Sequence, residues 1–87
     1  MKTKKEIEKE LEVRKERIKQ IRTFGSESEV SYERGYINCL SWILENFKNL
    51  EVSNDGIVWK LTTESPNDVN YDEGCKKAIK WALDLKN

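Results

Sequence analysis

The 87-residue chain contains no histidine and a single proline, and it has no long apolar run. Histidine is the side chain that most often acts as a general acid or base, so its absence removes the commonest catalytic group. The sequence also lacks a glycine-rich phosphate loop, a G-x-S-x-G nucleophile motif and any metal-ligand spacing. We therefore predict a non-enzymatic protein with no cofactor and no metal site.

Cysteine is also scarce, with only Cys39 and Cys75 present. They do not form a C-x-x-C motif, and no histidine could complete a zinc site, so we interpret them as buried thiols of a reduced protein. No stretch approaches the ~20 apolar residues of a membrane span. The basic start "MKTKKEIEKELE" has no apolar segment after it, unlike a signal peptide. These absences predict a soluble, cytoplasmic protein with no membrane partner.

The formal net charge is zero, but the charges are unevenly distributed. The net charge is +4 over residues 1–22, −7 over 23–75 and +3 over 76–87. The chain therefore lacks the strong positive charge on which non-specific nucleic-acid binding depends. A chain of this size buries only a thin core, which predicts a homo-oligomer.

Apolar periodicity predicts an antiparallel pair of helices in the first half of the chain. In the first segment apolar residues recur at alternating steps of four and three, provided that Arg14 fills one position, which predicts a helix over residues 3–23. Ser26 and Glu29 match the S-x-x-E pattern of a capping box, and a second helix follows over 29–48. The short connection predicts that the two helices form a hairpin.

The period of the apolar residues changes in the second half. Alternation over residues 50–62, interrupted by "SNDG", predicts a two-stranded β-hairpin. Ser65 and Pro66 are a helix-start signal, and we predict a last helix over 68–85. The predicted fold is a single domain over 1–87, α+β but helix-dominated, with the order α-α-β-β-α. Its predicted core consists of Ile7, Leu11, Ile18, Ile21, Tyr36, Cys39, Leu40, Ile43, Phe47, Val52, Ile57, Trp59, Leu61, Ala78, Ile79, Trp81 and Ala82.

A phrase occurs twice in the chain. "YERGYINCLSWIL" at residues 32–44 and "YDEGCKKAIKWAL" at 71–83 share Tyr, Gly, Trp and Leu at matched positions. A glycine inside a helix costs up to about 1 kcal/mol relative to alanine, so two such glycines favour two close helix contacts, each covered by an indole. On a helix, the glycine, the fourth residue after it and the Trp share one stripe. The predicted packing residues are Gly35, Cys39, Trp42, Gly74, Ala78 and Trp81. In the alternative interpretation the glycines admit a planar ligand that stacks on an aromatic ring.

The first phrase, with the charged helix before it, resembles small bacteriophage and prophage proteins. In these a charged helix and a short break precede a helix with the pattern G-x-x-x-x-L-x-W-x-L. Gly35, Leu40, Trp42 and Leu44 carry the resemblance, which covers residues 4–48. It implies a small accessory protein of a phage or mobile element that acts on host defence, and it supplies no active residues.

The first functional hypothesis is a module that binds and inhibits a host defence protein. The acidic middle of the chain would meet a basic surface of that protein. A solvated acidic face is the simpler interpretation of the same residues. The acidic side chains are Glu51, Asp55, Glu64 and Asp68.

Two further hypotheses concern anionic ligands. An oligomeric sponge would bind a small anionic nucleotide through cations and an aromatic ring. Alternatively, the basic first helix would bind nucleic acid, although interspersed glutamates weaken that hypothesis. The residues of the nucleotide hypothesis are Arg34, Tyr36, Lys76, Lys77 and Lys80, and those of the nucleic-acid hypothesis are Lys4, Lys5, Lys15, Lys19 and Arg22.

Overall fold

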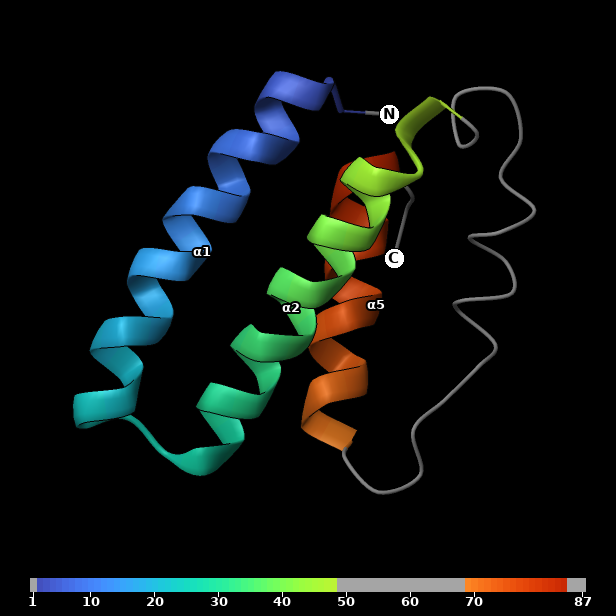
Figure 1. The fold of residues 1–87 in the computed structure, drawn as a ribbon. Helices are drawn as coiled ribbons and strands as arrows, with labels where there is room; N and C mark the ends of the chain where they lie inside the picture. Colours follow the sequence, from blue (N-terminus) through green and yellow to red (C-terminus); the bar gives the residue numbers. More distant parts are fainter. Residues whose placement is uncertain (1, 49–68, 85–87) are drawn as a thin grey trace.

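The computed structural model describes residues 2–48 and 69–84 of the chain, and these form three packed helices. Helix α1 spans Lys4–Phe24, α2 spans Glu27–Glu45 and α5 spans Val69–Leu83. Helices α1 and α2 run antiparallel as a hairpin, and α5 lies beside α2 and runs in the same direction (Figure 1). Helix α2 therefore contacts both of the others.

The α+β prediction is wrong, because the described residues form three helices and contain no strand. That prediction depended on a single segment, the alternating residues 50–62, which lie outside the described residues. The segments with a helical apolar period do form helices, and the chain is small and helix-rich. Among the described helices, none combines the length and apolar character needed to cross a membrane.

Both helices of the hairpin begin at a side-chain cap. The Oγ1 of Thr3 accepts a hydrogen bond from the backbone N–H of Glu6 at 3.2 Å, and the Glu6 carboxylate accepts one from the N–H of Thr3 at 3.2 Å. This reciprocal arrangement is a capping box. The Oγ of Ser26 accepts from the N–H of Glu29 at 3.3 Å, as the S-x-x-E pattern predicts. The two caps satisfy backbone donors that a helix start leaves unpaired.

The core lies where α2 faces both neighbours. Of the predicted core residues, Ile21, Phe47 and Trp81 are only partly buried, and Val52, Ile57, Trp59 and Leu61 lie outside the described residues. The indoles of Trp42 and Trp81 pack against the edge of the core. The buried cluster consists of Ile7, Leu11, Tyr36, Cys39, Leu40, Ile43, Cys75, Ala78, Ile79, Ala82 and Leu83.

Gly35 and Gly74 lie where α2 and α5 approach most closely. A Cβ placed on Gly35 would collide with the carbonyl oxygen of Tyr71 and would lie 2.9 Å from its carbonyl carbon. A Cβ placed on Gly74 would collide with the carbonyl oxygen of Tyr32 in the same way. Each tyrosine precedes the glycine of its own helix by three residues, so the two contacts are equivalent. The two copies of the repeated phrase therefore pack against one another about a local pseudo-twofold axis.

Cys39 and Cys75 form a disulfide that joins α2 to α5, with a Cα–Cα distance of 5.2 Å. The prediction of two separate thiols is therefore wrong. The glycine contact explains the difference, because it brings the two backbones within the range of roughly 4.4–6.8 Å that a disulfide spans. Cys39 follows Gly35 by one helical turn, and Cys75 follows Gly74 directly.

The start of the chain is attached to the end of α5. The backbone N–H of Lys2 donates to the carbonyl oxygen of Ala82 at 2.6 Å, and the Nζ of Lys2 lies 2.8 Å from the Oδ1 of Asp84. The same ammonium lies 5.6 Å from the centre of the Trp81 ring. These contacts hold the first turn of α1 beside the last turn of α5.

Candidate functional site: the arginines of the α1–α2 hairpin

All four arginines of the chain lie on the α1–α2 hairpin. Arg14, Arg17 and Arg22 belong to α1, and Arg34 belongs to α2. The planar guanidinium matches carboxylates and phosphates with two parallel hydrogen bonds, so arginine is the usual residue for recognising these anions. Two of them, the inner pair, form ion pairs with glutamates, and the other two, the outer pair, form none with the described residues.

The inner pair, Arg14 and Arg17, surrounds a buried carboxylate. Glu33 is only 2% exposed, and its Oε1 accepts from the Nη1 of Arg14 at 2.9 Å and lies 3.2 Å from the Nε of Arg17. The Nε of Arg14 also bonds the Oε1 of Glu10 at 3.2 Å. A carboxylate removed from water needs such partners, because its desolvation is costly. Arg14 thus lies on the side of α1 that faces α2, as expected from its place in the four-and-three spacing of the apolar residues.

The Arg14 guanidinium also covers the ring of Tyr36, with its central carbon 3.9 Å from the ring centre. This is a cation–π geometry. Burial, the largest single effect, would lower the pKa of Arg14, but Glu33, Tyr36 and Glu10 together outweigh it and the pKa is raised overall. Burial raises the pKa of the Tyr36 hydroxyl, although Arg14 opposes this. Because Tyr36 is 4% exposed, its ring supports Arg14 and offers no face to a ligand.

A pocket of about 500 Å³ borders this inner cluster. The Oε2 of Glu33 is buried and has no hydrogen-bond partner among the described residues. Burial also raises the pKa of the Tyr32 hydroxyl on the pocket wall. Two arginines and two glutamates in one wall leave no excess charge to select an ion. The pocket is lined by Arg14, Arg17, Ile21, Ser28, Glu29, Tyr32, Glu33 and Asn70.

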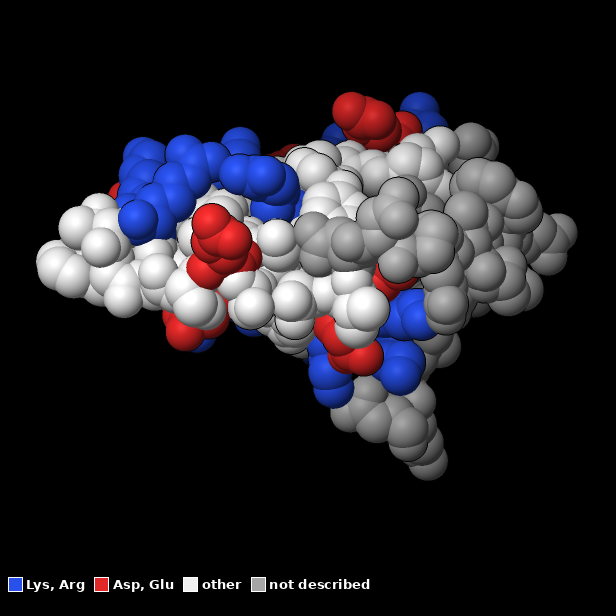
Figure 2. Space-filling view, turned by 90° about the horizontal axis from the view of Figure 1, so that it is seen from below, with Lys and Arg blue, Asp and Glu red and all other residues white. Residues whose placement is uncertain are grey.

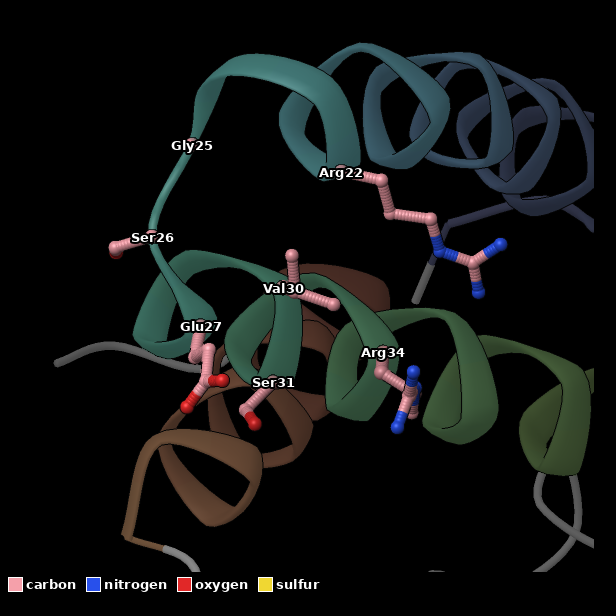
Figure 3. A pocket seen from close by; sticks show the side chains of 7 residues that line it. All are labelled: Arg22, Gly25, Ser26, Glu27, Val30, Ser31 and Arg34. Carbon is pink, nitrogen blue, oxygen red and sulfur yellow. The ribbon is translucent and has the colours of Figure 1, made fainter.

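The outer pair, Arg22 and Arg34, lines a second pocket of about 360 Å³ at the turn between the helices. Figure 3 shows both guanidiniums on one side of this pocket and the Glu27 carboxylate on the other. Within residues 2–48 and 69–84, neither guanidinium forms an ion pair. We call this the outer pocket; its walls are Arg22, Gly25, Ser26, Glu27, Val30, Ser31 and Arg34.

Phe24 lies beside the outer pocket, at the end of α1, and its surface is 90% exposed. The other large apolar side chains exposed in the described part are Val69 at 70% and Val13 at 53%. Figure 2 looks onto this end of the molecule and shows Lys and Arg side chains gathered along one side of it. The end of the hairpin therefore carries an exposed aromatic ring together with two arginines that form no ion pair within the described ranges.

The residues of the nucleotide hypothesis are not assembled into one site. Arg34 borders the outer pocket, whereas Tyr36 is buried under Arg14. The lysines of that hypothesis, Lys76, Lys77 and Lys80, lie on α5, and α5 supplies no residue to the outer pocket. The acidic residues of the first hypothesis, Glu51, Asp55, Glu64 and Asp68, lie outside the described residues. Of the nucleic-acid residues, Lys15 and Lys19 are paired with Glu12 and Glu16 at 3.7 and 3.1 Å.

Sequence reasoning missed Phe24 and Glu33, and it assigned Arg22 and Arg34 to separate hypotheses. One available signal was the confinement of every arginine to residues 14–34 of an 87-residue chain. In the described residues, no group of three His, Cys, Asp or Glu side chains is placed to hold a metal ion. Comparisons with protein-family models, with curated proteins and with solved structures found no match to this chain.

Proposed function

We propose that this chain is a non-enzymatic interaction module that binds another protein through the tip of its hairpin. The hairpin tip comprises the last turn of α1, the connection and the first two turns of α2, residues 22–34. One observation carries the proposal: the hairpin tip exposes 90% of Phe24, the last residue of α1, and also carries Arg22 and Arg34, which have no ion pair among the described residues. Aromatic residues and arginine are the types that most often dominate the binding energy of protein interfaces.

The same observation defines the chemistry of the partner. An exposed phenyl ring gains free energy when an apolar recess removes it from water. The two guanidiniums beside it favour carboxylates at the rim of that recess. We therefore propose a partner with an apolar recess flanked by acidic side chains.

The resemblance of residues 4–48 to phage and prophage proteins supports a more specific proposal. The α1–α2 hairpin accounts for nearly all of that stretch. We propose that the chain is an accessory protein of a phage or mobile element and that its partner is a host defence protein that it inhibits. The Cys39–Cys75 disulfide argues against the predicted cytoplasmic location, because disulfides are rare in reducing compartments. Residues 49–68, which contain all four acidic residues of the first hypothesis, would add a second contact surface in this proposal.

The experiment captures partners from host lysate and then measures binding of the purified partner to matched variants. Phe24→Ser removes the exposed ring, and Val13→Ser is the control, because Val13 is an exposed apolar residue elsewhere on α1. We expect Phe24→Ser to weaken binding at least about tenfold, the usual effect of losing a central interface residue, and Val13→Ser to leave it nearly unchanged. Equal affinity of both variants and the native chain would exclude the hairpin tip as the interface.

The predicted homo-oligomer stays a prediction, and light scattering on the same preparation tests it. A mass of 10.3 kDa corresponds to a monomer. If a multiple of this mass is found, the Phe24→Ser variant shows whether the tip also joins copies of the chain, because the oligomer would then dissociate.

A further inference from the structure

We infer that the outer pocket is an oxyanion site that binds a phosphate monoester between Arg22 and Arg34. The inference does not depend on the proposed function, because a phosphate compound can bind there when no protein is docked. A docked protein whose carboxylates contact the same two guanidiniums would compete with the phosphate.

The contrast between the two arginine pairs is the first argument. Arg14 and Arg17 share the Glu33 carboxylate, with contacts of 2.9 and 3.2 Å. Arg22 and Arg34 come from different helices, line one pocket and have no carboxylate partner among the described residues. Two like charges that line one pocket repel each other, and an anion bound between them turns this repulsion into attraction. Glu27 is the one carboxylate among the residues that line the outer pocket, and it pairs with neither arginine, so the described part of the pocket keeps an excess of positive charge.

The amount of charge favours phosphate over a carboxylate. A phosphate monoester carries about −1.5 to −2 charges at neutral pH and presents three acceptor oxygens. Each guanidinium can donate two parallel hydrogen bonds to such a group. A single carboxylate supplies one negative charge and two oxygens, which one arginine already matches. Two arginines in one pocket are thus complementary to a dianion.

The rest of the pocket wall suits the remainder of a small phosphorylated molecule. Its volume of about 360 Å³ is near the lower end for small-molecule sites. The hydroxyl groups of Ser26 and Ser31 can donate hydrogen bonds, and Val30 contributes an apolar surface between the two arginines (Figure 3). The Oγ of Ser26 accepts from the N–H of Glu29, but its own hydrogen stays available.

The surroundings both assist and limit anion binding. Lys15, Lys19 and Arg22 follow one another at i, i+4 and i+7 on α1, so they share one side of the helix. Such a stripe of cations raises the local concentration of anions. Glu27 has the opposite effect, since its carboxylate repels an anion from the far wall of the pocket. Its removal should therefore strengthen binding.

The test measures binding to the full chain by titration calorimetry at low salt, with inorganic phosphate, adenosine 5′-monophosphate and O-phosphoserine as probes and adenosine as the uncharged control. We expect the three phosphate compounds to bind and adenosine not to bind. Tighter binding of the nucleotide would identify a small metabolite as the source of the phosphate, and tighter binding of phosphoserine would identify a modified side chain. Either result supports an oxyanion site. If none of the three binds at about 10 mM, the inference is wrong.

Charge-matched variants separate a specific site from general attraction. Arg22→Gln and Arg34→Gln should each raise the Kd at least about tenfold, as expected for losing one bidentate charged contact. Lys19→Gln removes the same charge from the same side of α1 and should change the Kd less than about twofold. Glu27→Gln should lower the Kd severalfold. Equal effects of Lys19→Gln and Arg22→Gln would show diffuse electrostatic attraction and overturn the site. Phe24→Ser should leave phosphate binding intact, so this inference and the proposed protein interface can fail separately.

Discussion

Helix α2 has two neighbours, and it packs against them in opposite ways. Its contact with α5 brings the two backbones together at Gly35 and Gly74, and the disulfide and a 2.7 Å hydrogen bond from the Nδ2 of Asn38 to the hydroxyl of Tyr71 join the two helices. Its contact with α1 is built from long side chains, with aliphatic residues at one end, the buried Glu33 cluster in the middle and pockets near the turn. Among the described residues, the ion pairs of α2 with another helix all face α1.

The difference shows where the molecule tolerates change. A contact between two backbones cannot adjust to a larger side chain, because protein interiors are close-packed and even one added carbon atom lowers stability. A contact through long charged side chains leaves gaps that water or a ligand can fill. The α2–α5 contact therefore serves stability, and the α1–α2 hairpin offers binding chemistry. Substitutions in the two regions should separate these roles.

The largest expected effect comes from the disulfide. Replacing Cys39 and Cys75 together by Ala opens a loop with a sequence separation of 36, which should lower the free energy of unfolding by about 4 kcal/mol in the loop-entropy model. Urea unfolding under non-reducing conditions measures this loss. A reductant should destabilise the native chain by a similar amount and leave the variant unchanged. Two titratable thiols in the folded, unreduced native protein would contradict the cross-link.

The glycine contact should give the next largest effect. Gly35→Ala and Gly74→Ala each insert a methyl group against a carbonyl oxygen, so each should cost about 2 kcal/mol despite the better helix propensity of alanine. The pseudo-twofold relation predicts nearly equal losses. It also predicts that the double variant loses less than the sum, because the first methyl group already separates the helices.

The control for the glycine variants is Lys77→Ala, an exposed position on α5. It should change stability within about 0.5 kcal/mol. Unchanged melting of Gly35→Ala would contradict the close approach, and a loss at one glycine only would contradict the equivalence of the two contacts. Thermal unfolding followed by circular dichroism is sufficient for the four variants and the native chain.

The α2–α5 contact was largely predictable because its signal is local and repeated. The glycines and tryptophans recur at the same spacing in two segments, and each glycine carries a cost that only a close neighbour offsets. The disulfide was not predictable, because nothing in the positions of Cys39 and Cys75 along the chain gives the distance between two helices. That distance is short because Gly35 and Gly74 both lie where α2 crosses α5, and the sequence does not tell which helix each glycine faces.

The α1–α2 contact was predictable only in outline. The apolar spacing placed Arg14 on the side of α1 that faces α2. Its partner Glu33 lies 19 residues further along the chain, and no motif around Glu33 marks it as a buried residue. A charge pair between helices depends on their register, and no local preference sets that register. The prediction for residues 50–62 had the opposite weakness, because it depended on a local pattern alone. Alternation favours a strand, but a two-stranded hairpin is stable only on a packed surface, which the sequence does not specify.

The Glu33 cluster should give a moderate effect. Glu33→Gln keeps the shape of the side chain and removes the charge that Arg14 and Arg17 share, so we expect a loss of about 1–2 kcal/mol. Glu45→Gln makes the same charge change at an exposed position of α2 and should be nearly neutral. Urea unfolding of the two variants decides the matter. Equal stability of both would show that the cluster does not set the packing of α1 on α2.

The smallest expected effect concerns the ion pair between Lys2 and Asp84, which closes α1 against the end of α5. The hydrogen bond from Lys2 lowers the pKa of Asp84, and the same bond raises the pKa of Lys2. A lowered carboxyl pKa stabilises the fold above the unfolded value of about 3.9 and loses its effect as the pH falls through the folded value. A raised lysine pKa stabilises the fold below about 10.4 and loses its effect as the pH rises through the folded value.

Asp84→Asn isolates this charge effect. Asp84 adopts a left-handed backbone with φ of 57°, which asparagine also tolerates, so the substitution adds no backbone strain. We expect the native chain to melt at a slightly higher temperature than the variant between pH 5 and 9 and the two curves to converge in strong acid. Because Asp84 is exposed and Lys2 is partly exposed, at 51% and 28% of their side-chain surfaces, the difference should also shrink with added salt. A difference that persists unchanged at every pH would mean that Asp84 stabilises the end of α5 by its shape and not by its charge.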